Sequence, residues 1–158
     1  MKHAKESEIP WVERRSPKGR FHLFRRHISQ ALGAPFDAGV ERGGHPFDVE
    51  STRLPPGATN FPFHMHAAQW EMYLIQSGSG ELRTSEGTTA ITAGDVLVCP
   101  PGDAHQIKNT GTEDLQYYVI ADNQAVDVGF YPDTGKWFIK PQRKCFVLQE
   151  ADYYAGEE

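Results

Sequence analysis

Three histidines and one glutamate stand where their side chains could bind a metal ion. His64 and His66 lie two residues apart in the run FPFHMH, and the two-residue period of a strand sends both imidazoles to one face. Glu71 begins the next apolar run, WEMYLI, after a short bend that could return its carboxylate to the imidazoles. His105 follows CPPGDA, whose Pro and Gly residues favour a fixed turn. These four side chains are the candidate metal ligands.

The ligand types restrict the metal. Imidazole and carboxylate groups suit Zn, Mn, Fe, Ni, Co or Cu, whereas a calcium site requires oxygen ligands. We therefore predict one divalent transition metal. Four ligands supplied by two hairpins leave room for water or substrate, and such an open position distinguishes a catalytic metal site from a structural one.

Two neighbours of Glu71 share its alternating face and are candidate catalytic residues. Gln69 could replace Glu71 as a ligand or orient it. Tyr73 is either a core aromatic residue whose hydroxyl finds a partner, or a hydrogen-bond or proton donor to a substrate beside the metal. Both residues are predicted to contact substrate from the barrel wall if the strand runs unbroken through WEMYLI.

Short runs rich in β-branched and aromatic residues alternate with turn clusters over most of the chain, which is typical of an all-β sandwich or barrel. The predicted strands cover residues 46–54, 61–66, 70–77, 80–85, 88–92, 95–100, 105–109 and 115–122. The breaks between them contain PPG, SGSG, SEG, TAGD, PPGD and NTGTED, each with residues that favour chain reversal.

The flanking segments are less regular. Residues 20–32 show apolar spacing that fits a helix and an alternation that fits a strand, so both remain open. YPDTGKWFI and KCFVLQ predict two further short strands joined by PQR, before an acidic tail. We predict an N-terminal arm over residues 1–45 that packs on the barrel or on a partner subunit, and a barrel with C-terminal strands and tail over residues 46–158.

Length and charge restrict the class of protein. A chain of 158 residues favours a single domain, and no run is apolar enough for a signal sequence or a membrane span, so we expect a cytoplasmic protein. The formal charge of −5 argues against nucleic-acid binding. Residues 1–30 nevertheless carry eight Lys and Arg against three Glu. This basic segment could bind an anion or lie on an acidic body, and it motivates the prediction of a homodimer.

The arrangement of these residues resembles the two signature motifs of the cupin superfamily. The second motif is matched without a gap by Gly94, Pro100, Gly102, His105 and Asn109. The first is matched by Gly57, His64, His66, Glu71 and Gly78, with one extra residue between Gly57 and His64. The strings HAAQWE, YPDTGKW and DYYAGEE are similar to a group of small bacterial single-domain cupins.

The resemblance implies a double-stranded β-helix of the jelly-roll type, with small ligands entering beside the metal. It implies no particular reaction, because this fold carries enzymes and binding modules alike. We expect a metalloenzyme that acts on a polar or anionic small molecule, with a slight preference for an isomerase of the sugar-phosphate type because Gln69, Tyr73 and Arg83 suit such a substrate. The alternatives are a metal-dependent dioxygenase and a non-catalytic protein that binds a small ligand.

Overall fold

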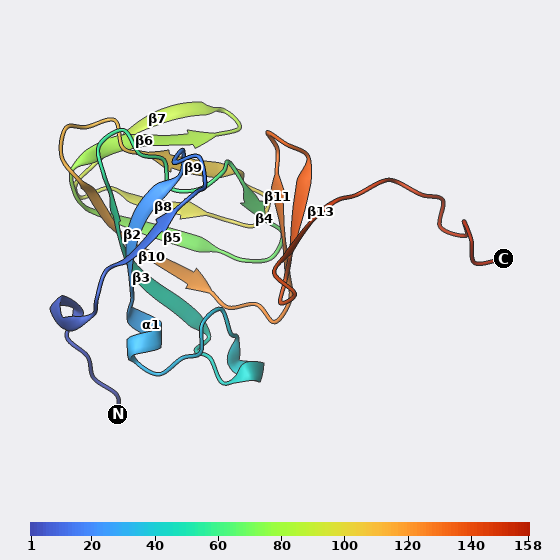
Figure 1. The fold of residues 1–158 in the computed structure, drawn as a ribbon, viewed down its shortest axis with the longest axis horizontal. Helices are drawn as coiled ribbons and strands as arrows, with labels where there is room; N and C mark the ends of the chain where they lie inside the picture. Colours follow the sequence, from blue (N-terminus) through green and yellow to red (C-terminus); the bar gives the residue numbers. More distant parts are fainter.

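Strands make up almost all of the regular secondary structure of this computed structural model, which describes residues 1–158 (Figure 1). They are β1 (Val12–Arg15), β2 (His22–His27), β3 (Phe47–Leu54), β4 (Met65–His66), β5 (Glu71–Ser77), β6 (Ser79–Thr84), β7 (Gly87–Thr92), β8 (Val96–Cys99), β9 (His105–Lys108), β10 (Leu115–Asp122), β11 (Asp127–Tyr131), β12 (Lys136–Lys140) and β13 (Lys144–Val147). The helical segments are α1 (Ile28–Ala31), η1 (Glu6–Glu8) and η2 (Val40–Arg42). The predicted all-β fold class is confirmed.

The strands form three antiparallel sheets. The largest has the order β1-β2-β3-β10-β5-β8, and the others have the orders β13-β12-β11-β4 and β7-β6-β9. An isolated antiparallel bridge between His64 and His105 joins the edge of β4 to the edge of β9. The two smaller sheets are therefore linked at the residues predicted to bind metal.

The hydrophobic core lies between the six-stranded sheet and the β7-β6-β9 sheet. Strand β10 shows why, because its residues alternate strictly between buried and half-buried positions, as expected of a strand with one face in a core. The ten core residues are Leu23, Leu54, Tyr73, Ile75, Ile91, Cys99, Ile107, Leu115, Tyr117 and Val119. Because β5 lies between β10 and β8, the start of β5 is held at one end of this core.

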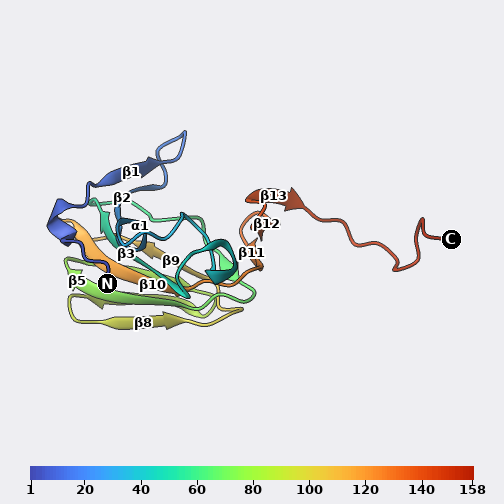
Figure 2. The same cartoon turned by 90° about the horizontal axis from the view of Figure 1, so that it is seen from below.

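The N-terminal segment contributes to the main sheet. Residues 20–32, for which the sequence allowed a helix or a strand, contain one of each, because β2 is followed directly by α1. Strand β2 pairs with β3, and Leu23 is buried in the core. Strand β1 forms the outer edge of the sheet (Figure 2). The packing of residues 1–45 on a partner subunit stays a prediction.

Two segments differ from the strands expected from the sequence. Only Met65–His66 of the predicted strand 61–66 forms a named strand, because Pro62 has no N–H to donate to a ladder. Strand β11 was not predicted at all, whereas the two expected C-terminal strands are present as β12 and β13. Beyond β13, the chain extends away from the body of the molecule (Figures 1 and 2). No helix has the length and apolar character that spanning a membrane requires.

Candidate metal centre

Backbone hydrogen bonds hold the four predicted ligands beside one another. The His64 amide donates to the His105 carbonyl oxygen at 3.2 Å, and the His105 amide donates back to the His64 carbonyl at 2.8 Å. The amide of Gly102, in the turn before β9, donates to the carbonyl of His66 at 2.8 Å. Glu71 is the first residue of β5 and lies beside Cys99 of β8. The turn before β9 is thus tied directly to β4.

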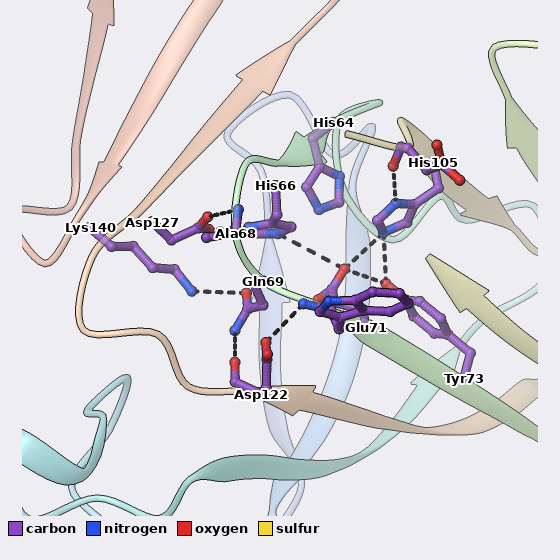
Figure 3. A network of polar contacts seen from close by, with 12 residues as sticks. His64, His66, Ala68, Gln69, Glu71, Tyr73, His105, Asp122, Asp127 and Lys140 are labelled. Carbon is purple, nitrogen blue, oxygen red and sulfur yellow. Dashed lines mark hydrogen bonds and ion pairs between the residues drawn. The ribbon is translucent and has the colours of Figure 1, made fainter. Parts of the chain in front are cut away.

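The side chains converge as the strand pattern predicts (Figure 3). One ligand atom from each of His64, His66 and Glu71 lies within 4.8 Å of the others, which is a spacing that could hold a metal ion. His105 joins this group through Glu71, because its Nε2 is 2.8 Å from Glu71 Oε2. The same carboxylate oxygen is 3.9 Å from Nε2 of His66. Glu71 is therefore the residue around which the histidines gather.

The outward-facing nitrogen of each histidine has a partner that sets its tautomer. Nδ1 of His64 donates to the Pro62 carbonyl at 2.8 Å, and Nδ1 of His105 donates to the Asp103 carbonyl at 3.1 Å. Nδ1 of His66 donates to Oδ2 of Asp127 at 2.5 Å. With the proton of the neutral ring at Nδ1, Nε2 of His64 and of His66 can offer a lone pair, whereas Nε2 of His105 must first lose the proton that it donates to Glu71. This arrangement fits a divalent transition metal.

Asp127 is a functional candidate that the sequence analysis missed. Its side chain is buried and also accepts a hydrogen bond from the Ala68 amide at 2.9 Å. Burial opposes its ionisation, but the hydrogen bond and charge of His66 hold the pKa of the carboxyl below its ordinary value. A carboxylate behind a metal-binding imidazole orients the ring and raises its basicity. The sequence signal that could have indicated it is the strand-like alternation in DVGFY, the segment that forms β11.

Electrostatics prepare the site for a cation. Burial lowers the pKa of His64 to about 4, so this imidazole is neutral at pH 7. Burial disfavours the Glu71 carboxylate, yet the hydrogen bond from His105 and the charge of His66 hold its pKa well below its ordinary value. Burial also disfavours a charged His105, but hydrogen bonds to Cys99 and Glu71 raise its pKa to about 10. Metal binding through His105 would therefore displace a proton.

Tyr73 lies behind Glu71. Its hydroxyl donates to Glu71 Oε2 at 2.9 Å and is 3.0 Å from Nε2 of His105. The side chain is buried, and its ring packs edge-on against Tyr117. Burial and the charge of Glu71 raise the pKa of the phenol well above 10. Tyr73 thus supports the carboxylate from the core side, and its predicted contact with substrate stays a prediction.

Gln69 has the same parity as Glu71 but a different environment. Its Nε2 donates to the Asp122 carbonyl at 2.6 Å, and its Oε1 accepts from Nζ of Lys140 at 3.2 Å. Gln69 precedes β5 and is buried beside the ligand group (Figure 3). Of the two alternatives considered for this position, Glu71 is the one that belongs to the group of ligand atoms. The predicted catalytic role of Gln69 stays a prediction.

A cavity of about 300 Å³ opens beside the ligands, and His64, His66, Glu71 and Gln69 are among its lining residues. Only six of its eighteen lining residues are hydrophobic, so the cavity suits a polar molecule. Tyr73, His105 and Arg83 do not line it. Arg83 instead forms a two-pronged ion pair with Asp133 on the exposed surface. Arg83 therefore lies outside this cavity, as an exposed strand cation, and does not support the preference for an anionic substrate there.

The fold and the ligand group define a class of protein that comparison with known families identifies. Residues 51–121 match the family described as Cupin domain. The matched residues include all four predicted ligands, and the match supports the resemblance to cupins that the two motifs indicate.

Two curated relatives and a solved structure are similar to this chain. The Oxalate-binding protein of Thermotoga maritima is 35% identical over 68 residues, covering 43% of this chain and 55% of the relative. Auxin-binding protein 1 of Arabidopsis thaliana is 34% identical over 93 residues, covering 53% of this chain and 44% of the relative. The chain thus spans about half the length of these relatives.

The solved structure is a sugar phosphate isomerase of the cupin superfamily from Silicibacter pomeroyi. Its TM-score is 0.75 with 20% identity, covering 91% of this chain and 90% of that one. At this identity the likeness establishes the double-stranded β-helix fold. It does not carry the activity of that protein over to this chain.

Proposed function

We propose that this protein binds one divalent transition metal through His64, His66, Glu71 and His105 and uses it to hold a small, oxygen-rich anion. The observation that carries the proposal is the convergence of three ligand atoms within 4.8 Å of one another beside a polar cavity. An ion held there would act as a Lewis acid toward a substrate oxygen. The name of the Thermotoga maritima relative, which is that of an oxalate-binding protein, supports an anionic ligand.

Among the possible reactions, isomerisation of a sugar-phosphate type is favoured. Such a reaction needs a group that moves a proton between neighbouring carbon atoms. Asp48 and Glu50 of β3 line the cavity, and burial together with the charge of Glu50 raises the pKa of Asp48. A carboxyl group with a raised pKa in a cleft is suited to proton transfer. The likeness in fold to a sugar phosphate isomerase adds to the same preference.

Two alternatives have different requirements. A dioxygenase would need a metal that reacts with oxygen and would not need Asp48 as a base. A protein that only binds its ligand would need neither a metal that reacts with oxygen nor a base. The predicted homodimer applies to all three functions, and β8 is an edge strand of the main sheet that a second subunit could cover.

The test begins with elemental analysis of protein purified without a metal-affinity tag. The proposal expects close to one Zn, Mn, Fe, Ni, Co or Cu ion per chain, and a protein that retains none after exposure to these ions contradicts it. Ribose 5-phosphate in D₂O then tests isomerisation, because proton transfer at the carbon beside the carbonyl introduces deuterium that NMR detects. An oxygen-dependent change in the metal spectrum would favour the dioxygenase instead.

Light scattering of the full chain tests the dimer. A protein that remains monomeric at high micromolar concentration would contradict the prediction of a homodimer. The same measurement with and without added metal shows whether the association depends on the site.

A further inference from the structure

Charged side chains line the cavity beyond the metal ligands. Arg14 comes from β1, Arg25 from β2, Lys140 from the end of β12, and Arg143 from the turn before β13. Four carboxylates line the same cavity, namely Asp37, Asp48, Glu50 and Glu71. The four cations and four anions cancel formally, so a bound divalent ion would make the cavity net positive. An anion would then be attracted into it although the whole chain has a formal charge of −5.

Three of the four cations already have carboxylate partners. Nη1 of Arg25 is 2.5 Å from Oε2 of Glu50. Lys140 Nζ is 3.3 Å from one oxygen of Asp37, and Nε of Arg143 is 3.7 Å from the other. These three side chains therefore share two carboxylates, Glu50 and Asp37.

Arg14 is the exception among the four cations of the cavity. It makes no ion pair and no side-chain hydrogen bond, whereas each of the other three makes an ion pair. Its strand partner is Leu23, which is buried in the core, so the two side chains share the inward face of the sheet. Partial burial and the charge of Arg25 lower the pKa of Arg14, and the charges of Glu50 and Asp37 oppose this shift only in part. An anion between these guanidinium groups would relieve their repulsion.

The size of the cavity limits what can lie between Arg14 and the metal ligands. At about 30 Å³ for each water molecule of the liquid, 300 Å³ corresponds to about ten waters. This volume suits a ligand with roughly ten to fifteen non-hydrogen atoms, such as a short dicarboxylate or a pentose phosphate. The cavity has an exposed end and a buried end. Arg14 is exposed and lies at the exposed end, called the mouth here, whereas the side chains of His66 and Glu71 at the buried end are 11% and 14% exposed.

We infer that Arg14 determines ligand specificity by binding a terminal carboxylate or phosphate group while the other end of the ligand lies at the metal. This inference rests on the proposed function and adds the second point of recognition. Arginine suits the role because its planar guanidinium donates two parallel hydrogen bonds to either anion. The ligand class is a small molecule with an oxygen-rich end for the metal and an anionic group at its other end.

Two pairs of probes test the inference by isothermal titration. Malate and lactate share an α-hydroxycarboxylate end that can bind a metal, but only malate has a second carboxylate. Ribose 5-phosphate and ribose differ in the same way by a phosphate. The wild-type protein should bind the charged member of at least one pair about tenfold more tightly, which is the effect expected of one charge-assisted hydrogen bond. The pair that shows the difference identifies carboxylate or phosphate as the terminal group.

The variant Arg14→Gln should remove that difference and leave binding of lactate or ribose unchanged. Arg15→Gln is the matched control, because Arg15 lies on the same strand, carries the same charge and does not line the cavity. It should retain the wild-type preference. A loss of preference in Arg14→Gln alone separates specific contact from a general loss of positive charge.

The inference is overturned if Arg14→Gln retains the preference, or if the wild-type protein binds none of the four probes at millimolar concentration. Metal content is measured in the same samples by elemental analysis. A failed metal assignment would appear there as missing metal, independently of the preference for malate or ribose 5-phosphate. The two failures are therefore distinguishable.

Discussion

The cavity has two ends that are built differently. The metal end uses residues between His64 and His105, and short hydrogen bonds fix each imidazole and Glu71. The mouth uses charged residues from strands near the two ends of the chain, β1, β2 and β12, and from the turn beyond β12. Three of its cations are paired and one, Arg14, is free to bind a ligand.

The difference separates two tasks. The metal end depends on strand periodicity and one turn, so a short stretch of sequence can specify it. The mouth depends on chain segments that meet only in the folded protein. Ligand choice could therefore change through the mouth while the metal end stays the same, which is one way a fold can carry many functions.

The largest effect is expected at the metal end. His64→Ala and His66→Ala each remove one of few metal ligands, so the metal content should fall from near one ion per chain toward zero. Elemental analysis of the purified variants measures this. His22→Ala is the control, because His22 pairs with Glu13 outside the cavity and should leave the content unchanged. Full metal content in both ligand variants would refute the assignment.

A smaller effect is expected behind the ligands. Asp127→Asn retains an oxygen that can accept from the Ala68 amide but removes the negative charge that faces His66. Metal affinity should fall about 10- to 100-fold, as for other carboxylates that orient a metal-binding imidazole. Competition with a chelator of known affinity measures it. Asp133→Asn, on the surface, should have no effect, and equal affinities for both variants would remove Asp127 from the site.

At the wall of the cavity, Glu50 should contribute stability that depends on pH. Burial opposes its charge, but Arg25 and His27 lower the pKa of Glu50 below the ordinary value of 4.5. A lowered pKa in the folded state means that the contribution is present above pH 4.5 and is lost as the pH falls through the folded-state pKa.

Glu50→Gln should therefore lower the free energy of unfolding by about 2 kcal/mol at pH 7, as expected for lost hydrogen bonds to a charged group. The difference from wild type should shrink as the pH falls below 4.5. Urea unfolding at pH 7 and at lower pH values measures both quantities. A difference that is constant over this range would contradict the role of the carboxylate charge.

The smallest effect is expected outside the cavity. Arg83 and Asp133 form an ion pair in which both side chains are about 40% exposed, so Arg83→Gln should change the free energy of unfolding by less than about 1 kcal/mol. Because Arg83 lies outside the cavity, this variant should also retain full metal content and the wild-type preference among the probes. Thermal unfolding and the titrations described above measure these outcomes. If Arg83→Gln loses the preference for the charged probes, cations at the mouth of the cavity and cations elsewhere on the surface are not distinct in function.

Much of the fold was predictable because the strands from β3 to β10 combine clear alternation with strong turn residues. The ligands followed from the same alternation, since His64 and His66 lie two residues apart and Pro and Gly fix the turn before His105. Strand β4 is shorter than expected, because Pro62 has no N–H to donate and the alternation of apolar residues does not show this. Strand parity also placed Tyr73 and Gln69 near Glu71 but did not indicate their partners.

The candidate metal ligands could be selected from the sequence because their geometry is local, being set by the strand period and by one turn. Their supporting groups could not. Asp127 reaches His66 only because β11 pairs with β4, and Arg14 reaches the cavity only because β1 and β2 join the sheet beside β3. Burial and ion pairing then decide which charges remain free, and both depend on contacts between residues far apart in the chain.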